Sequence, residues 1–228
     1  MCHLQPVDWS SGWPVMGNAG EPYWKFRKPK SDSKTIVNPV ETDEFDSSKL
    51  GMQWQWQNDY KESYGQATSM GFFRLFTYAL PELGDVSNLW YVPNMLLQKI
   101  PADEFTATTK LSFCSRNSDQ YVGLVCMSAE YSSVGLQRTE DGYELQIRHN
   151  PNAMRTHLTD EVLTVDTLKP TQKGTPRKGR PAEMHIKDVY LRMSIKDSKV
   201  NYAYSIDGKK WKKAGGEYAT VSYTHLRA

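Results

Sequence analysis

Apolar and polar residues alternate in many short stretches of this chain, and this alternation is the feature that most restricts its fold. In residues 50–57, Met52, Trp54 and Trp56 point to one side, while three glutamines point to the other. A period of two residues is the signature of a β-strand with one covered face. Because two indoles bury a large apolar area, we expect these tryptophans to pack against an opposing sheet.

Short strands are predicted along the rest of the chain as well. They are expected at residues 72–77, 89–92, 95–99, 105–113, 121–127, 132–137, 143–148, 189–195 and 200–205. Residues 121–127 are almost continuously apolar, as in a central strand, and Glu140-Asp141-Gly142 predicts a hairpin turn. Residues 153–168 have a weak helical period, but their β-branched residues favour strand. The sequence therefore predicts an all-β, antiparallel sandwich without a long helix.

Charge and hydropathy narrow the choice of partners. The net charge of +2 over 228 residues gives no electrostatic reason for a nucleic-acid or membrane partner. The basic loop at residues 169–183 has no interleaved aromatic residues, and no apolar run is long enough to span a bilayer. The first residues lack the basic and apolar regions of a signal peptide. Either the protein stays inside the cell or its true N-terminus lies before residue 1, so its localisation stays open.

The cysteines and histidines form no recognisable motif. Cys2, Cys114 and Cys126 are odd in number and widely spaced, which indicates neither a disulfide framework nor a zinc knuckle. Cys114 and Cys126 lie in apolar strand-like runs, and we expect both to be buried free thiols. The five histidines are scattered, and none pairs with another at metal-ligand spacing.

Carboxylates are possible catalytic residues, because glycoside hydrolysis uses two of them across the scissile bond. The acidic groups at residues 43–46, 140–141 and 160–161 stand beside turns or a linker, which favours solvated side chains. Asp43 and Asp46 have a second interpretation as calcium ligands, together with a carboxylate from elsewhere. Serine elbows, P-loops and dinucleotide-binding glycine patterns are absent from the sequence, so no catalytic residue and no other cofactor is predicted.

Aromatic side chains are the remaining candidates for binding, because the flat apolar faces of sugars stack on rings. Trp54 and Trp56 are expected in the core, since aromatic residues of a sandwich mostly pack inside it. Trp90 and Tyr91 precede Pro93 and are the predicted substrate-binding residues.

Several separate motifs occur in an order that resembles one enzyme family. The segments that resemble the end of the catalytic domain of family 43 glycoside hydrolases are His3-Leu4-Gln5-Pro6-Val7, Trp9, Gly12-Trp13-Pro14-Val15-Met16-Gly17 and Gly20-Glu21-Pro22. The segments that resemble the C-terminal domain of its β-xylosidase and α-L-arabinofuranosidase members are residues 50–56, 94–99, 104–111, 123–127 and 204–211.

The resemblance implies a concanavalin A-like β-sandwich, or jelly roll, that follows a five-bladed propeller. The family's catalytic residues, an aspartate base, a glutamate acid and a further aspartate, lie in the propeller, upstream of residue 1, so none is assigned here. The domains implied are residues 1–28 as the closing segment of the propeller, 29–41 as a linker and 42–221 as the sandwich. Residues 222–228 do not resemble the family; we expect a non-native tail there and a sandwich without its last strand or strands.

Three functions follow as hypotheses. In the first, the chain is the accessory sandwich of a family 43 glycosidase that acts on xylosides or arabinofuranosides of hemicellulose. It would brace the propeller and border its cleft. In the second, it is a free-standing carbohydrate-binding module for xylan-type sugars that uses Trp90 and Tyr91. In the third, it is an independent enzyme that uses a carboxylate such as Asp43 or Asp46.

Overall fold

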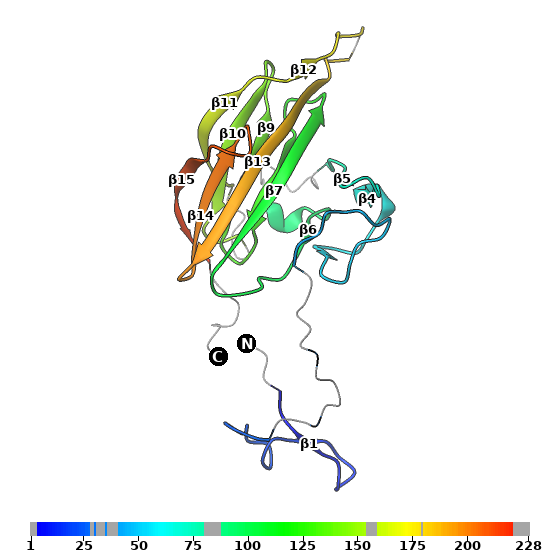
Figure 1. Cartoon of the computed structure of the whole chain (residues 1–228), viewed down its shortest axis with the longest axis vertical. Helices are drawn as coiled ribbons and strands as arrows, with labels where there is room; N and C mark the ends of the chain where they lie inside the picture. Colours follow the sequence, from blue (N-terminus) through cyan, green and yellow to red (C-terminus); the bar gives the residue numbers. More distant parts are fainter. Residues whose placement is uncertain are drawn as a thin grey trace. The chain divides into compact units, whose positions relative to one another are not determined.

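The structure, a computed structural model, divides the chain into two compact units, residues 1–39 and residues 40–228 (Figure 1). The residues that it describes are 4–27, 30, 35, 41–79, 88–153, 159–178 and 180–220. The predicted tail at residues 222–228 lies outside them, and so does most of the predicted linker at residues 29–41. Over the described ranges, no helix has the length and hydropathy needed to cross a lipid bilayer.

The described part of the first unit contains a small hairpin. Its strands, β1 (Val7–Asp8) and β2 (Val15–Met16), pair antiparallel. The chain turns at residues 10–12, where the Gly12 N–H donates to the Trp9 carbonyl at 2.9 Å and Gly12 has a φ of 78°. Two strands of two residues cannot cover an indole ring, and Trp24 is fully exposed. The described part of this unit therefore has no apolar core of its own.

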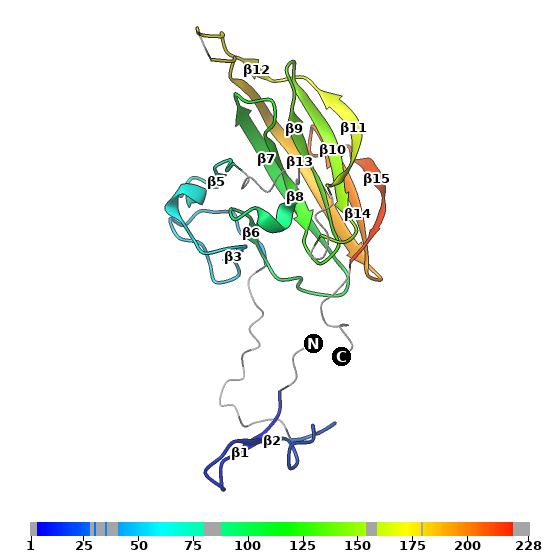
Figure 2. The ribbon, with the colours of Figure 1, turned by 180° about the vertical axis from the view of Figure 1, so that it is seen from behind.

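Within the described part of the second unit, four antiparallel strands form one sheet, in the order β11-β10-β9-β8 (Figure 2). The strands are β8 (Tyr121–Cys126), β9 (Tyr131–Arg138), β10 (Tyr143–Asn150) and β11 (Glu161–Leu168). The predicted hairpin at residues 140–142 is confirmed, because Arg138 lies opposite Tyr143. Residues 121–127 do form a strand, β8, but the prediction that it is central is wrong, because β8 lies at the edge of the sheet as far as the structure describes it.

Five antiparallel strands of the described residues form the other sheet of the sandwich. They are β7 (Phe105–Ser115), β12 (Gln172–Lys173), β13 (Met184–Lys196), β14 (Lys199–Ser205) and β15 (Lys212–Ala219). The long strand β13 pairs with β7 along one edge, and β12 and β14 share its other edge. A bulge at Lys187–Asp188, with Asp188 at a φ of 58°, shifts the alternation of β13 by one residue, so that its apolar side chains stay on the inner face.

The hydrophobic core lies between the two sheets, which Figures 1 and 2 show stacked face to face. Strands β7, β8, β9, β10, β13 and β14 contribute alternate side chains over most of their length, as their sequence period predicts, whereas β12 contributes none. Fully buried members include Val134, Leu136, Tyr143, Leu145, Ile147, Leu191, Val200 and Tyr202. Complete burial of one such aliphatic side chain contributes about 1.5–3 kcal/mol. The predicted all-β, antiparallel sandwich is confirmed.

Residues 41–100 precede the sandwich strands and form shorter elements. These are β3 (Gln55–Trp56), η1 (Glu62–Tyr64), β4 (Gly65–Ala67), β5 (Phe73–Leu75), η2 (Leu89–Tyr91) and β6 (Leu96–Leu97), where η marks a 3-10 helix. The strand predicted at residues 50–57 is reduced to β3, which pairs with β6. The strand predicted at residues 89–92 is wrong, because η2 stands there.

Candidate functional site

Trp90 and Tyr91, the predicted sugar contacts, lie on the short helix η2. The buried side chain of Asn88 caps this helix by accepting a hydrogen bond from the Trp90 N–H at 2.9 Å, and its Nδ2 donates to the Ala153 carbonyl at 2.9 Å. The Leu89 N–H donates to the Tyr131 hydroxyl at 2.9 Å, which ties η2 to β9. Trp90 is half-buried and Tyr91 is 37% exposed. Of the pair, Tyr91 offers more of its ring to solvent.

A partly buried carboxyl, that of Asp160, binds the same Tyr131 hydroxyl as this helix. The Tyr131 hydroxyl donates to the Asp160 carboxylate, and Asn150 Nδ2 donates to Asp160 Oδ1 at 3.2 Å. Burial raises the pKa of Asp160, against the opposing effect of these two donors. The prediction of a solvated turn at residues 160–161 is therefore wrong for Asp160, whose side chain is part of the structure that positions η2.

Asp43, one of the two predicted calcium ligands, has a structural role. Its Oδ1 accepts from the Phe45 N–H at 2.7 Å, and its Oδ2 accepts from the Trp54 indole N–H at 2.7 Å. The Phe45 ring stacks on Trp54 with a centroid distance of 5.5 Å. Asp46 is exposed. Over the described ranges, neither residue belongs to a group of three His, Cys, Asp or Glu side chains close enough to share an ion, so calcium binding here stays a prediction.

A shallow pocket of about 300 Å³ lies among the short elements of residues 41–79. Trp56, Tyr60 and Phe73 line it, with ring centroids 5.7 Å apart for Trp56–Tyr60 and 6.0 Å apart for Trp56–Phe73. The prediction that Trp54 and Trp56 enter the sandwich core is wrong, because neither belongs to the core cluster. An open, aromatic-lined pocket of this size is at the small end of the range for ligand sites.

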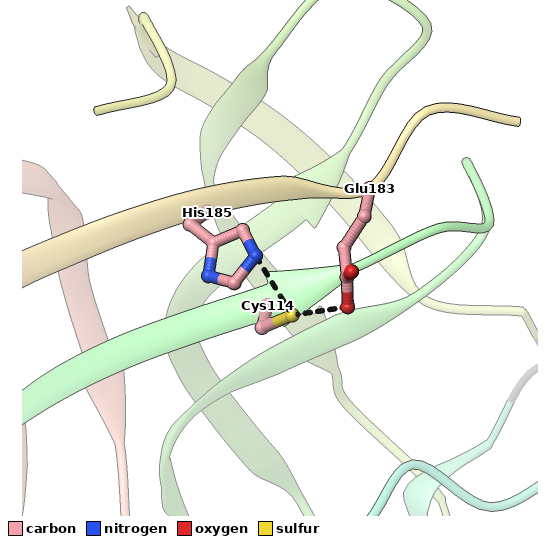
Figure 3. A group of neighbouring side chains, drawn as sticks. All are labelled: Cys114, Glu183 and His185. Carbon is pink, nitrogen blue, oxygen red and sulfur yellow. Dashed lines mark hydrogen bonds between the residues drawn. The ribbon is translucent and has the colours of Figure 1, made fainter. Parts of the chain in front are cut away.

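A second group of polar side chains gathers on β7 and at the start of β13 (Figure 3). Cys114 Sγ donates to Glu183 Oε1 at 3.0 Å and lies 3.4 Å from His185 Nε2. Arg116 Nη2 binds the other oxygen of the same carboxylate at 3.3 Å. We call Cys114, Glu183 and His185 the thiol cluster.

The thiol cluster is accessible, and its cysteine is protonated. Cys114 is exposed, so the prediction that it is buried is wrong, whereas the same prediction for Cys126 is confirmed. Partial burial and the hydrogen bond to Glu183 raise the pKa of the Cys114 thiol to about 11. Because the thiolate is the nucleophilic form, this cysteine is poorly suited to nucleophilic catalysis at neutral pH.

The thiol cluster was missed in the sequence because its members are far apart along the chain. Cys114 and His185 become direct cross-strand partners only through the antiparallel register of β7 and β13. A search for short ligand spacings does not detect such a pair. The detectable signal was the alternation within 105–113 and 189–195, which predicts both strands but not their pairing.

Two stacked antiparallel sheets with one apolar core between them define this protein as a β-sandwich. The sequence model described as "Beta xylosidase C-terminal Concanavalin A-like domain" matches residues 42–226. The chain therefore belongs to the family of C-terminal concanavalin A-like domains of family 43 glycoside hydrolases.

Curated relatives agree with this assignment. The chain is 27% identical over 244 residues to the "Beta-xylosidase" of Formosa agariphila, which matches 96% of this chain and 37% of that protein. It is 26% identical over 178 residues to the "Non-reducing end alpha-L-arabinofuranosidase BoGH43B" of Bacteroides ovatus. This match covers 77% of this chain and 31% of that protein. The chain thus spans about a third of the length of these relatives.

Solved structures show the same fold. The GH43 BlXynB protein from Bacillus licheniformis aligns with a TM-score of 0.61 at 22% identity, covering 95% of this chain and 38% of that one. A xylan beta-1,4-xylosidase from Bacillus halodurans aligns with a TM-score of 0.61 at 18% identity, again covering 95% and 38%. Identities this low establish the likeness of fold alone.

Proposed function

We propose that this chain serves as the accessory β-sandwich of a family 43 glycosidase that acts on xylosides or arabinofuranosides. In this role it braces a catalytic propeller and borders the propeller's cleft. The observation that carries the proposal is the match of residues 42–226 to the C-terminal domain of β-xylosidases. Relatives about three times as long leave room for a separate catalytic domain.

Exposed apolar side chains support a bracing role. The segment 41–79 exposes a series of large apolar residues: Met52, Tyr60, Met70, Phe72, Leu75, Phe76 and Tyr78. Exposed apolar surface of this kind often marks contact with another protein surface. We infer that the propeller covers part of this segment, which we call the apolar segment.

The first unit supports the same proposal. Its small hairpin exposes the indoles of Trp9, Trp13 and Trp24. A unit with so little structure of its own is more stable when a larger body covers it. We propose that residues 1–28 are the closing segment of the propeller and that residues 29–41 are the linker to the sandwich.

Hydrolysis of aryl β-xyloside and aryl α-L-arabinofuranoside tests the proposal. The purified chain is compared with a longer chain in which a family 43 propeller precedes residue 1. We expect turnover by the longer chain alone, because the acid and base belong to the propeller. Turnover by the short chain would overturn the proposal and make the carboxylates of the sandwich, Asp43 and Asp46 first, the catalytic candidates.

The aromatic-lined pocket favours a second function, that of a carbohydrate-binding module for xylan-type sugars. Trp56 and Tyr60 lie at its wall, and Tyr91 on η2 is a further exposed ring. Titration of the chain with xylo-oligosaccharides, followed by tryptophan fluorescence, distinguishes the two functions. Saturable millimolar or tighter binding that Tyr60→Ala or Tyr91→Ala abolishes favours the binding module, whereas the accessory role predicts no saturable binding.

A further inference from the structure

The thiol cluster has the arrangement of a metal site, independent of any role in sugar hydrolysis. In an antiparallel pair, directly opposed residues project from the same face, so Cys114 of β7 and His185 of β13 stand side by side. Glu183 precedes His185 by two residues, and the period of two brings it to the same face. Figure 3 shows the three side chains converging in front of the two strands.

The distances between the ligand atoms are close to those of a tetrahedral zinc site. With Zn–S of about 2.3 Å and Zn–N or Zn–O of about 2.0 Å, tetrahedral geometry requires S···N and S···O separations of about 3.5 Å. The Cys114 Sγ lies 3.4 Å from His185 Nε2 and 3.0 Å from Glu183 Oε1. The three ligand atoms all lie within 4.8 Å of one another.

We propose that Cys114, Glu183 and His185 bind one Zn²⁺ ion on the outer face of the five-stranded sheet. Binding breaks the S–H bond of Cys114, forms a Zn–S bond and releases the proton to solvent, with no change of oxidation state. His185 binds through neutral Nε2 and Glu183 through one carboxylate oxygen. Because Cys114 is exposed, the fourth position of the ion is left to water or to an added ligand.

The ligand types select zinc over hard cations. Calcium and magnesium prefer oxygen ligands, whereas a thiolate and an imidazole suit zinc and its chemical neighbours. Arg116 holds Glu183 Oε2 and leaves Oε1 directed at Cys114. This contact orients the carboxylate toward the metal position, as partners of metal ligands commonly do.

Cobalt substitution tests the proposal, because a cysteine thiolate bound to Co²⁺ has a charge-transfer absorption band in the near ultraviolet. The chain is titrated with Co²⁺ and then with Zn²⁺. We expect one Co²⁺ per chain, with the band removed as Zn²⁺ displaces it. Cys114→Ser should abolish the band although Cys2 and Cys126 remain, and Cys126→Ala should retain it.

The remaining ligands are tested in the same titration. We expect His185→Ala and Glu183→Gln each to weaken Co²⁺ binding by about 10-fold or more, since changes even to partners of metal ligands weaken binding this much. Circular dichroism of each variant shows whether the sandwich is folded. A missing band in the unaltered chain, or an unchanged band in folded Cys114→Ser, would overturn the proposal whatever the outcome of the hydrolysis assay.

Discussion

Two buried tyrosine hydroxyls connect the two sheets of the sandwich. The Tyr143 hydroxyl of β10 donates to the Met184 carbonyl of β13 at 2.7 Å, and the Tyr202 hydroxyl of β14 donates to the Ser132 carbonyl of β9 at 2.6 Å. Burial raises the pKa of Tyr143 to about 12, so its hydroxyl remains a donor at neutral pH. These hydrogen bonds are directional, so they restrict how the two sheets can pack, whereas the surrounding apolar contacts are non-directional.

Tyr143→Phe should lower the free energy of unfolding by about 1 kcal/mol, because it removes the buried hydroxyl that donates to the Met184 and Phe113 carbonyls while leaving the ring in place. Urea denaturation measures the loss. Tyr60→Phe is the matched control, because Tyr60 is 57% exposed and such surface changes stay within about 0.5 kcal/mol. Equal effects of the two substitutions would contradict a connecting role for Tyr143.

Asp160 makes stability depend on pH in a predictable direction. Burial raises its pKa in the folded state, so the folded protein binds the proton more tightly than the unfolded chain. Its contribution to stability is present below the ordinary carboxyl pKa and is lost as pH rises through the folded-state pKa. We expect Asp160→Asn to gain stability relative to the unaltered chain as pH rises above about 4. Urea denaturation at several pH values measures this.

Asp207 should affect the pH dependence of stability in the opposite direction, because its pKa is lowered in the folded state. The Lys210 and Lys209 backbone N–H groups donate to its Oδ1 and, with the Ser205 hydroxyl, hold its pKa at about 2. A lowered pKa contributes stability above the ordinary carboxyl pKa, which is lost as pH falls toward the folded-state value. Asp207→Asn should therefore lose stability relative to the unaltered chain as pH rises from about 2 to about 4. If the stability difference from the unaltered chain changed with pH in the same direction for both variants, this would contradict a raised pKa for Asp160.

At the scale of elements, the alternation of residues predicted the sandwich strands but not the segment before them. Strands β7 and β14, and strand β13 on each side of its bulge, alternate as their sequence predicts, because each pairs with at least one neighbouring strand and packs one face on the core. Residues 50–57 alternate just as strictly, yet only β3 forms there. Asp43 and Phe45 hold Trp54 by local contacts, and these contacts compete with a regular ladder.

The edge strand β15 contains a bulge that requires glycine. Asn201 lies opposite Glu217 and Tyr202 lies opposite Ala214, so Gly215 and Gly216 are the two extra residues. Gly215 has a φ of 69°, and a Cβ there would lie 2.9 Å from Ile147 Cγ1 in the opposite sheet.

Gly215→Ala should destabilise the sandwich by about 1–2 kcal/mol or more, because a left-handed conformation is unfavourable for alanine. Gly216→Ala is the matched control, since a Cβ there meets nothing within 4 Å. The two variants are compared by thermal unfolding. Similar losses in the two variants would contradict a specific requirement for glycine at position 215.

At the scale of the whole molecule, the sequence motifs predicted the family and the fold more completely than the sites. The family motifs are local and can be recognised in one segment at a time. The thiol cluster depends on the register between β7 and β13, and the pocket depends on how the short elements of residues 41–79 pack. Those arrangements arise from long-range pairing, which residue order alone does not specify.

The central claim is that this sandwich packs against a catalytic propeller, which covers part of the apolar segment. Hydrogen–deuterium exchange of the chain alone, compared with the longer chain that carries a family 43 propeller before residue 1, tests it most directly. We expect slower exchange in residues 41–79 of the longer chain and unchanged exchange in the core strand β10. Identical exchange in residues 41–79 of both chains would contradict the claim.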